Sequence, residues 1–176
     1  MLRGQGVDPA RRYFFPIVGY NFRITNLACA LLCAQLERAE AIIADRKRVF
    51  DAYTERLSGV EGIGFQPVAP WAEPTPWLYS ITVDPDRFGL SRDELMLALD
   101  AQGIETRPFF VPVHQLPPYR GSRRAGPGDL PVTAALAGSG MNLPTFGQLD
   151  EATIDRIADA IRDLGAKADA SKGSAR

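Results

Sequence analysis

The chain has 176 residues, of which 45% are hydrophobic and 23% are charged, so it is long enough to bury one hydrophobic core. A formal net charge of −1 and an isoelectric point near 5.9 argue against a nucleic-acid-binding surface. No stretch approaches the roughly 18 uncharged apolar residues of a membrane span, and the first residues lack the apolar core of a signal peptide. We therefore expect a folded cytoplasmic protein.

The N-terminal third is predicted to be a connector and loop followed by one long helix. Residues 1–25 contain Gly, Pro and Arg in the mixture that is typical of irregular backbone. From Asn26, a suitable N-cap, residues 26–58 contain no Pro or Gly, and Gly59 is a fitting stop. Apolar residues recur at helical spacing, at Leu32, Leu36, Ala39, Ile43, Phe50, Tyr53 and Leu57. A helix of about 30 residues is roughly 45 Å long, so we expect part of it to pack on something outside this chain.

Residues 59–165 are predicted to form a small α+β domain. Alternating apolar and polar residues predict a strand over Trp77–Val83, and a second strand over Ile104–Phe110 is expected to pair with it. Ser91 and Glu94 have the spacing of a capping box at the start of a helix.

The other expected elements are shorter or lie nearer the C-terminus. Gly103 is expected to end the capped helix, and Asp84-Pro85-Asp86 is expected to be a turn. They are followed by a helix over 132–137, a strand over 141–143, and a helix capped by Asp150 and closed by Gly165. Residues 166–176 are expected to be a disordered tail.

No metal site is expected. Cys29 and Cys33 are four residues apart on the predicted helix, but a tetrahedral zinc site needs more ligands and His114 is the only histidine. We interpret the two cysteines as small buried packing residues.

Several motifs are spread in sequence along most of the chain. They are Gly19-Tyr20-Asn21-Phe22-Arg23-Ile24-Thr25-Asn26, Ala34-Gln35-Leu36-Glu37, Trp77-Leu78-Tyr79-Ser80, Gly103-Ile104-Glu105-Thr106-Arg107-Pro108-Phe109-Phe110, Pro112-Val113-His114-Gln115-Leu116-Pro117-Pro118-Tyr119 and Asn142-Leu143-Pro144-Thr145. In this order they resemble the DegT/DnrJ/EryC1/StrS family of pyridoxal-phosphate-dependent sugar aminotransferases. The resemblance runs from about Leu2 to Leu164.

The resemblance implies a fold, a reaction and partners. The fold would be the small C-terminal domain of a fold type I aminotransferase, preceded by a long helix at the interface between domains or subunits. The cofactor would be pyridoxal phosphate, and the reaction would move an amino group from glutamate to a 4-keto-6-deoxy sugar nucleotide. The partner would be a second copy or another aminotransferase subunit, because in this family the loop ahead of the helix reaches into the neighbouring site.

Members of this family bind the cofactor through a lysine in a large N-terminal domain, and this sequence resembles the part of those proteins that lies C-terminal to that lysine. Its lysines are Lys47, Lys167 and Lys172. Lys47 stands between two arginines and the others lie in the predicted tail, so none is expected in the pocket that a catalytic lysine needs. We therefore expect no catalytic residue in this chain, which would be inactive alone.

Two residues of the loop are assigned to the cofactor by the resemblance. Asn21 and Arg23 would bind its phosphate or lie in the surroundings of the phosphate in the partner's site, since an amide donor and a guanidinium fork suit phosphate oxygens. From the residues alone, the favoured interpretation is that Asn21 is a turn residue and Arg23 a surface charge.

Five further residues are candidates for substrate binding. Arg107 follows a strand beside aromatic residues, which suits an anion such as a diphosphate. His114 matches a family histidine near the sugar, although a single histidine is often structural. Tyr20, Tyr79 and Phe109 are candidates for flanking the sugar or base, although aromatic residues at strand spacing also serve as core.

Two functions remain after this reading. The first is the C-terminal part of a nucleotide-sugar aminotransferase that is split, truncated or frame-shifted. The second is a non-catalytic binding or dimerisation module derived from such an enzyme.

Overall fold

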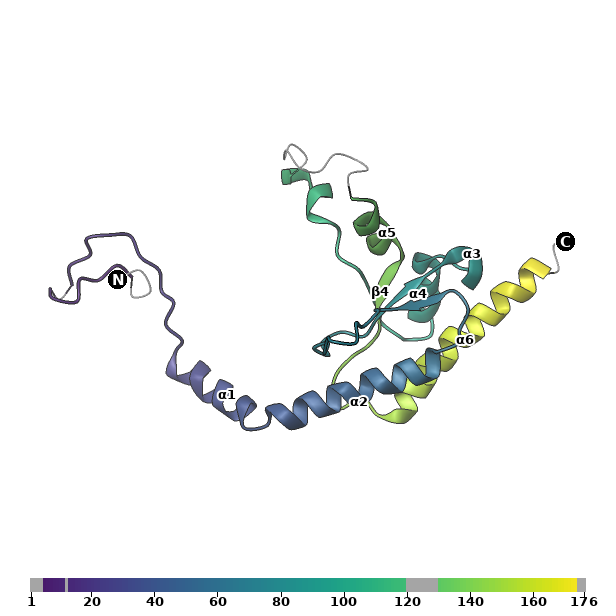
Figure 1. Cartoon of the computed structure of the whole chain (residues 1–176), viewed down its shortest axis with the longest axis horizontal. Coiled ribbons are helices and arrows are strands. Elements are labelled where there is room, and N and C mark those ends of the chain that lie inside the picture. Colours follow the sequence, from purple (N-terminus) through teal and green to yellow (C-terminus); the bar gives the residue numbers. More distant parts are fainter. Residues whose placement is uncertain (1–4, 12, 120–129, 174–176) are drawn as a thin grey trace. The chain divides into compact units, whose positions relative to one another are not determined.

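The computed structural model describes residues 5–11, 13–119 and 130–173 of the chain (Figure 1). It divides into two compact units, Met1–Ala41 and Ile42–Arg176, which we describe separately. The boundary between them falls inside the stretch that the sequence predicts to be one helix. None of the described helices is both long and apolar enough to cross a bilayer.

The long helix predicted over residues 26–58 is two helices, α1 (Asn26–Leu36) and α2 (Ala39–Leu57). The break has a backbone cause, because the N–H of Arg38 donates to the carbonyl of Gln35, three residues back, at 3.2 Å. The N-cap of α1 is Thr25, whose hydroxyl accepts from the N–H of Ala28 at 3.3 Å, so Asn26 is the first helical residue and not the cap. Gly59 stops α2 as predicted, with a φ of 92°.

The second unit is built on a four-stranded antiparallel sheet in the order β1-β2-β4-β3. Its strands are β1 (Ile63–Phe65), β2 (Ser80–Val83), β4 (Gly140–Asn142) and β3 (Arg107–Pro108). The predicted pairing of the strand near Trp77 with the strand near Arg107 is wrong, because β4 lies between β2 and β3. The unit is a mixed arrangement of helix and sheet, as predicted.

One face of this sheet carries the hydrophobic core. Ile81 and Val83 of β2 and Met141 of β4 are at most 1% exposed and pack with apolar residues of α2 and of α6 (Glu151–Gly173). The larger core residues of α2 and α6 are Val49, Tyr53, Leu57, Ile154, Ile157 and Ile161. Ser80 and Thr82 alternate with the core residues along β2, so they lie on the opposite face of the sheet.

Ion pairs join α2 to α6 at the surface of this core. Arg48 and Arg56 both pair with Glu151, each at 2.7 Å, and Arg56 also pairs with Asp155. The hydrogen bond to Asp155 is the main reason that the pKa of Arg56 is raised above its ordinary value. Figure 1 shows the two helices running beside each other.

The short helices agree more closely with the sequence-based predictions. Helix α4 (Arg92–Asp100) begins with the predicted capping box of Ser91 and Glu94, and α3 (Pro85–Phe88) occupies the predicted turn with Asp84 as its cap. Helix α5 (Pro131–Ser139) begins at a proline, and two 3-10 turns, η1 (Val113–Gln115) and η2 (Pro117–Tyr119), precede it.

The predicted end of the last helix is wrong. Gly165 does not close it, because α6 continues to Gly173 through residues that we expected to be disordered. Gly165 is instead a packing residue: a Cβ at this position would lie 2.9 Å from Cε2 of Phe88. The prediction that Asp150 caps α6 is confirmed, since the carboxylate of Asp150 accepts from the N–H of Thr153 at 2.8 Å.

Candidate functional site

The loop ahead of α1 presents its side chains to solvent. Tyr20 is 57% and Phe22 69% exposed, and their rings stack with centroids 5.3 Å apart. A Cβ on Gly19 would run into the backbone of Gln5 and Gly6, so glycine is required where these two segments pass. The loop therefore has a defined backbone although its side chains are exposed.

Asn21 and Arg23 lie on this loop with their polar groups available. The side-chain oxygen of Asn21 accepts from the N–H of Arg23 at 3.4 Å, which is the turn role that the residues alone suggested. Its amide nitrogen and the Arg23 guanidinium make no hydrogen bond within the described part of the chain. These are the donor groups that a phosphate monoester needs, so the residues present fit that part of a pyridoxal phosphate.

Arg107 lies in the second unit at the edge of the sheet, in β3. It stands opposite Asn142 of β4, is exposed, and pairs with Glu105 at 3.5 Å. Both Arg107 and Arg156 of α6 line a cavity of about 940 Å³. Arg156 donates to the carbonyl of Gln102 at 2.5 Å. The cavity has the volume of a small-molecule site, and its charged lining consists of these two arginines and Glu105.

The aromatic candidates have different surroundings. Tyr79 is 4% exposed, stacks on Tyr53 at 4.9 Å, and its hydroxyl shares a 2.9 Å hydrogen bond with Thr54. Burial raises the pKa of Tyr79 above its ordinary value. Tyr79 is therefore a core residue in this structure, whereas the half-buried Phe109 lines the cavity beside Arg107.

His114 lies in η1, five residues after Phe109, and is half-buried. Phe110 and Val111, which lie between Phe109 and His114 in the sequence, are 81% and 60% exposed. The structure thus brings Arg107 and Phe109 to one cavity, whereas Tyr20, Asn21 and Arg23 belong to the other unit.

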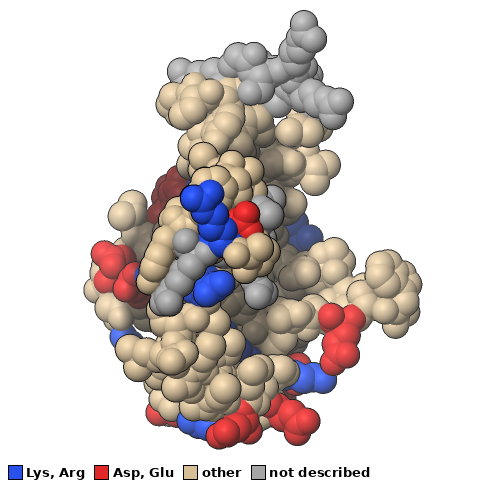
Figure 2. Space-filling model, turned by 90° about the vertical axis from the view of Figure 1, so that its left-hand side faces the viewer, with Lys and Arg blue, Asp and Glu red and all other residues tan. Residues whose placement is uncertain are grey.

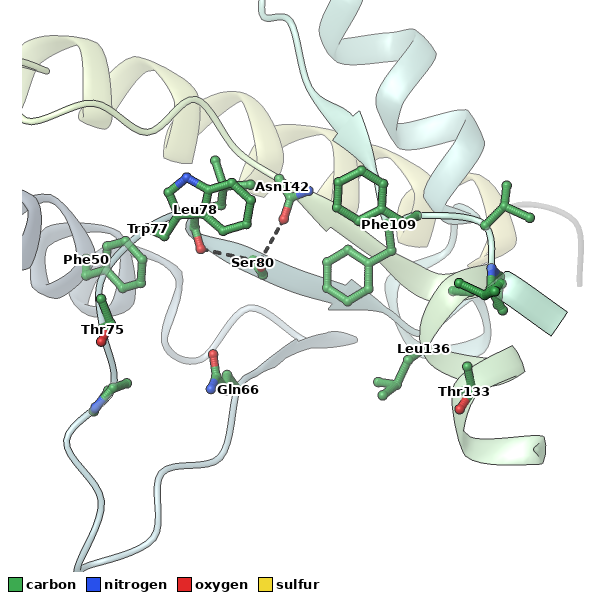
Figure 3. Close-up of a pocket in the computed structure, with 16 residues that line it drawn as sticks. Phe50, Gln66, Thr75, Trp77, Leu78, Ser80, Phe109, Thr133, Leu136 and Asn142 are labelled. Atoms are coloured by element: carbon green, nitrogen blue, oxygen red, sulfur yellow. Dashed lines mark hydrogen bonds between the residues drawn. The ribbon is translucent and has the colours of Figure 1, made fainter. Parts of the chain in front are cut away.

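A second cavity, of about 620 Å³, is lined by several polar residues that the sequence analysis did not select, among them Ser80 and Asn142. The hydroxyl of Ser80 donates to the side-chain oxygen of Asn142 at 2.7 Å (Figure 3). Both residues lie on the sheet face that is turned away from the core. Two polar residues that face each other across neighbouring strands indicate such a site. This pairing could not be predicted from the sequence, because it depends on the register between β2 and β4.

The two lysine side chains that the structure describes lie apart from these two cavities. Lys47 and Lys167 are exposed on α2 and α6, and neither lines the cavity of Arg107 or that of Ser80. The side chain of Lys172 is outside the described residues. Across residues 5–11, 13–119 and 130–173, no three His, Cys, Asp or Glu side chains are grouped as metal ligands.

Exposed apolar side chains are frequent in the first unit. Leu27, Leu31, Leu32 and Leu36 of α1 are between 49% and 75% exposed. The expectation that the two cysteines of α1 are buried is wrong, because Cys33 is exposed and Cys29 is only half-buried. On the face drawn in Figure 2, most of the surface belongs to uncharged residues, and neither sign of charge gathers into a single patch. A row of exposed leucines such as that on α1 is typical of a surface that is covered by a partner.

Comparisons with known proteins agree on one family. The model of the DegT/DnrJ/EryC1/StrS aminotransferase family matches residues 1–162. GDP-perosamine synthase of Caulobacter vibrioides is 41% identical over 162 residues, which are 92% of this chain and 43% of that protein. The dTDP-3-amino-3,4,6-trideoxy-alpha-D-glucose transaminase of Streptomyces venezuelae is 31% identical over 171 residues, which are 96% of this chain and 42% of that one.

Solved structures show the same relationship. The crystal structure of S. venezuelae DesV matches with a TM-score of 0.82 at 30% identity, covering 94% of this chain and 42% of DesV. DesI matches with a TM-score of 0.81 at 27% identity, covering 99% of this chain and 44% of DesI. This chain thus spans about 43% of the curated relatives that it matches. It belongs to the DegT/DnrJ/EryC1/StrS aminotransferase family.

Proposed function

We propose that this chain is the C-terminal part of a pyridoxal-phosphate-dependent nucleotide-sugar aminotransferase of the perosamine synthase type. Its reaction would move the amino group of glutamate to a 4-keto-6-deoxy sugar nucleotide. The observation that carries the proposal is the 41% identity to a GDP-perosamine synthase over 92% of the chain. In this assignment residues 59–165 belong to the small domain, and α1 and α2 connect it to the rest of the protein.

The loop ahead of α1 would hold the cofactor phosphate. Arg23 offers a guanidinium that makes no ion pair among the described residues, and Asn21 offers an amide nitrogen. When bound, pyridoxal phosphate supplies the electron sink that amino-group transfer requires. We place the lysine that binds it outside this chain, because neither Lys47 nor Lys167 lines the cavity of Arg107 or that of Ser80.

The cavity of Arg107 would bind the nucleotide sugar. Its two arginines suit the two negative charges of a diphosphate, and Phe109 forms part of the wall beside them. Tyr20 and His114 would contact the sugar. Tyr79 would not contact the substrate and would only support the residues around it, since its ring is buried between Tyr53 and Phe50.

The assembly would be a homodimer in which the loop ahead of α1 serves the neighbouring site. The exposed leucines of α1 support an interface at this helix. The other candidate is a non-catalytic module that binds a sugar nucleotide or an aminotransferase subunit. The observation that favours it is the position of Lys47 and Lys167, neither of which lines a candidate site.

Binding of GDP-linked sugar to the full chain tests the proposal. Titration calorimetry should show binding that weakens when Arg107→Ala removes a charged partner of the diphosphate, by about 10-fold or more given 1.5–3 kcal/mol for a hydrogen bond to a charged group. Arg87→Ala is the matched control, because Arg87 pairs with Glu61 on the surface and lines neither cavity. No binding, or equal binding by both variants, would contradict the assignment of this cavity.

A further inference from the structure

The cavity of Arg107 has two walls that the sheet does not hold together over their whole length. Trp77 and Leu78 belong to one wall, ahead of β2, and residues 143–146 belong to the other, after β4. The register between β2 and β4 begins only at Ser80. Among the described residues, no backbone hydrogen bond joins Trp77 or Leu78 to the opposite wall. Other contacts therefore fix where the first wall lies.

Side chains of α2 supply contacts to both walls. Arg46 donates from Nη1 to the carbonyl of Trp77 at 2.7 Å. Tyr53, two helical turns further along α2, donates to the carbonyl of Pro144 at 3.0 Å. Both walls are thus attached by hydrogen bonds to the same helix.

Trp77 depends on its bond from Arg46 more than its neighbours depend on any one contact. Across the part of the chain that the structure describes, Trp77 makes no other hydrogen bond, and residues 73–76 make none. The ring of Trp77 is 63% exposed and stacks on no described aromatic ring. Tyr79, by contrast, is buried, and its N–H donates to the hydroxyl of Thr145 at 2.9 Å.

A second arginine of α2 has a different set of contacts. Arg48 donates to the carbonyls of Gly147 and Leu149 at 3.2 and 2.7 Å, and it pairs with Glu151 at the start of α6. Its removal would therefore disturb the packing of α2 on α6. Arg46 is half-buried and makes no ion pair among the described residues, so its removal leaves those contacts in place.

We propose that Arg46 is a positioning residue for substrate binding, which fixes the Trp77 wall of the cavity of Arg107 by holding the Trp77 carbonyl. Arg46 lines neither that cavity nor the cavity of Ser80, so it acts through Trp77 and not by touching the substrate. A charged donor suits this task, because its hydrogen bond to a carbonyl is stronger than that of a neutral donor. A wall that is already in place need not be ordered by the ligand, which raises affinity. This inference rests on the proposed function and adds a residue outside the cavity that sets its affinity.

Fluorescence anisotropy tests whether Arg46 holds Trp77. Trp71 and Trp77 are the only tryptophans, so in a Trp71→Phe variant of the full chain Trp77 is the only indole that reports. In this background, Arg46→Ala should increase the amplitude of nanosecond motion in the anisotropy decay. Arg46→Lys keeps a charged donor and should restore the restricted decay.

Lys47→Ala is the matched control for both measurements. It removes the next positive charge of the same helix, and Lys47 is exposed and lines neither the cavity of Arg107 nor that of Ser80. Circular dichroism and urea unfolding of each variant establish that it is folded under the conditions of the experiment. A loss of overall stability alone would not change the decay of Trp77 in the folded state.

Titration with GDP, which carries the diphosphate, tests the consequence for binding. Arg46→Ala should weaken GDP binding by about 2- to 10-fold, the range expected when binding has to order one side chain. Arg46→Lys should recover most of this affinity. Lys47→Ala should bind GDP as the Trp71→Phe parent does.

The outcomes separate this inference from the proposed function. Equal anisotropy decays for Arg46→Ala and Lys47→Ala would overturn the inference, whatever their GDP affinities. Faster motion in Arg46→Ala with unchanged GDP affinity would also overturn it, while the proposed function stands as long as binding still depends on Arg107. If the parent binds no GDP, the proposed function fails at this cavity and the inference fails with it. Faster motion of Trp77 together with weaker GDP binding, both reversed by Arg46→Lys, supports the positioning role.

Discussion

The hydroxyl of Tyr53 is predicted to stabilise the second unit from inside its core. Tyr53 is 0% exposed, and its hydroxyl donates to the carbonyl of Pro144 at 3.0 Å. Tyr53→Phe keeps the ring that stacks on Tyr79 and removes only the donor, so the Pro144 carbonyl loses its partner. Leaving such an acceptor unsatisfied should lower the free energy of unfolding by about 1–3 kcal/mol.

The same residue predicts the response of stability to alkaline pH. Burial, followed by the neighbouring Tyr79, raises the pKa of Tyr53 far above its ordinary value. The unfolded chain therefore loses this proton first, and stability should fall as pH rises above about 10, the ordinary tyrosine pKa. Tyr53→Phe should make that fall shallower, because one of the two buried tyrosines no longer titrates.

Urea unfolding at pH 7 and across alkaline pH measures both effects. Tyr119→Phe is the matched control, since Tyr119 is 48% exposed and lies outside the core. The reasoning would be refuted if Tyr53→Phe and Tyr119→Phe had equal unfolding free energies at pH 7. An unchanged alkaline dependence in the Tyr53 variant would refute the pKa argument separately.

Three further predictions concern α6, its cap and the exposed helix. Gly165→Val should destabilise the chain by about 1–3 kcal/mol in urea unfolding, because its side chain would overlap Phe88; Gly138→Ala, with open space around it, should not. Asp150→Ala should lower the melting temperature at neutral pH, and the difference should vanish as pH falls through the pKa of Asp150, which its hydrogen bonds to Thr153 lower. Sedimentation at micromolar concentration should show self-association that Leu31→Lys reduces, and a monomer before any substitution would contradict our account of α1.

Local signals in the sequence predicted local structure well. The capping box of Ser91 and Glu94, the cap at Asp150 and the stop at Gly59 each depend on a few neighbouring residues, and each is confirmed. The extent of strands was predicted less well. The predicted strand begins at Trp77, but β2 begins at Ser80, because the N–H of Tyr79 donates to the Thr145 hydroxyl and not to a neighbouring strand.

The errors come from contacts between distant parts of the chain. The position of β4 between β2 and β3 depends on pairings across about 60 residues, which no local pattern encodes. Gly165 resembles a helix stop, yet it is present because Phe88 packs on it. Ser80 and Asn142 were missed for the same reason, since they become neighbours only in the folded sheet.

The resemblance to the family predicted more of the candidate site than the residues alone did. Arg107 and Phe109 were selected from it, and the structure places both at one cavity. Tyr79 lies in another of the family motifs and was also a candidate, yet its side chain is in the core. A motif thus identifies a segment, whereas the direction of each side chain depends on the sheet register.

Reconstitution with the missing part of a relative tests the central claim most directly. The full chain is mixed with the part of the Caulobacter vibrioides GDP-perosamine synthase that this chain does not match, and transfer of ¹⁵N from labelled glutamate to a GDP-4-keto-6-deoxy sugar is followed by mass spectrometry. We predict transfer in the mixture, none from either part alone, and loss of transfer with Arg23→Ala but not with Arg87→Ala. Absence of transfer from a mixture in which both parts are folded and associated would contradict the aminotransferase assignment and favour the non-catalytic module.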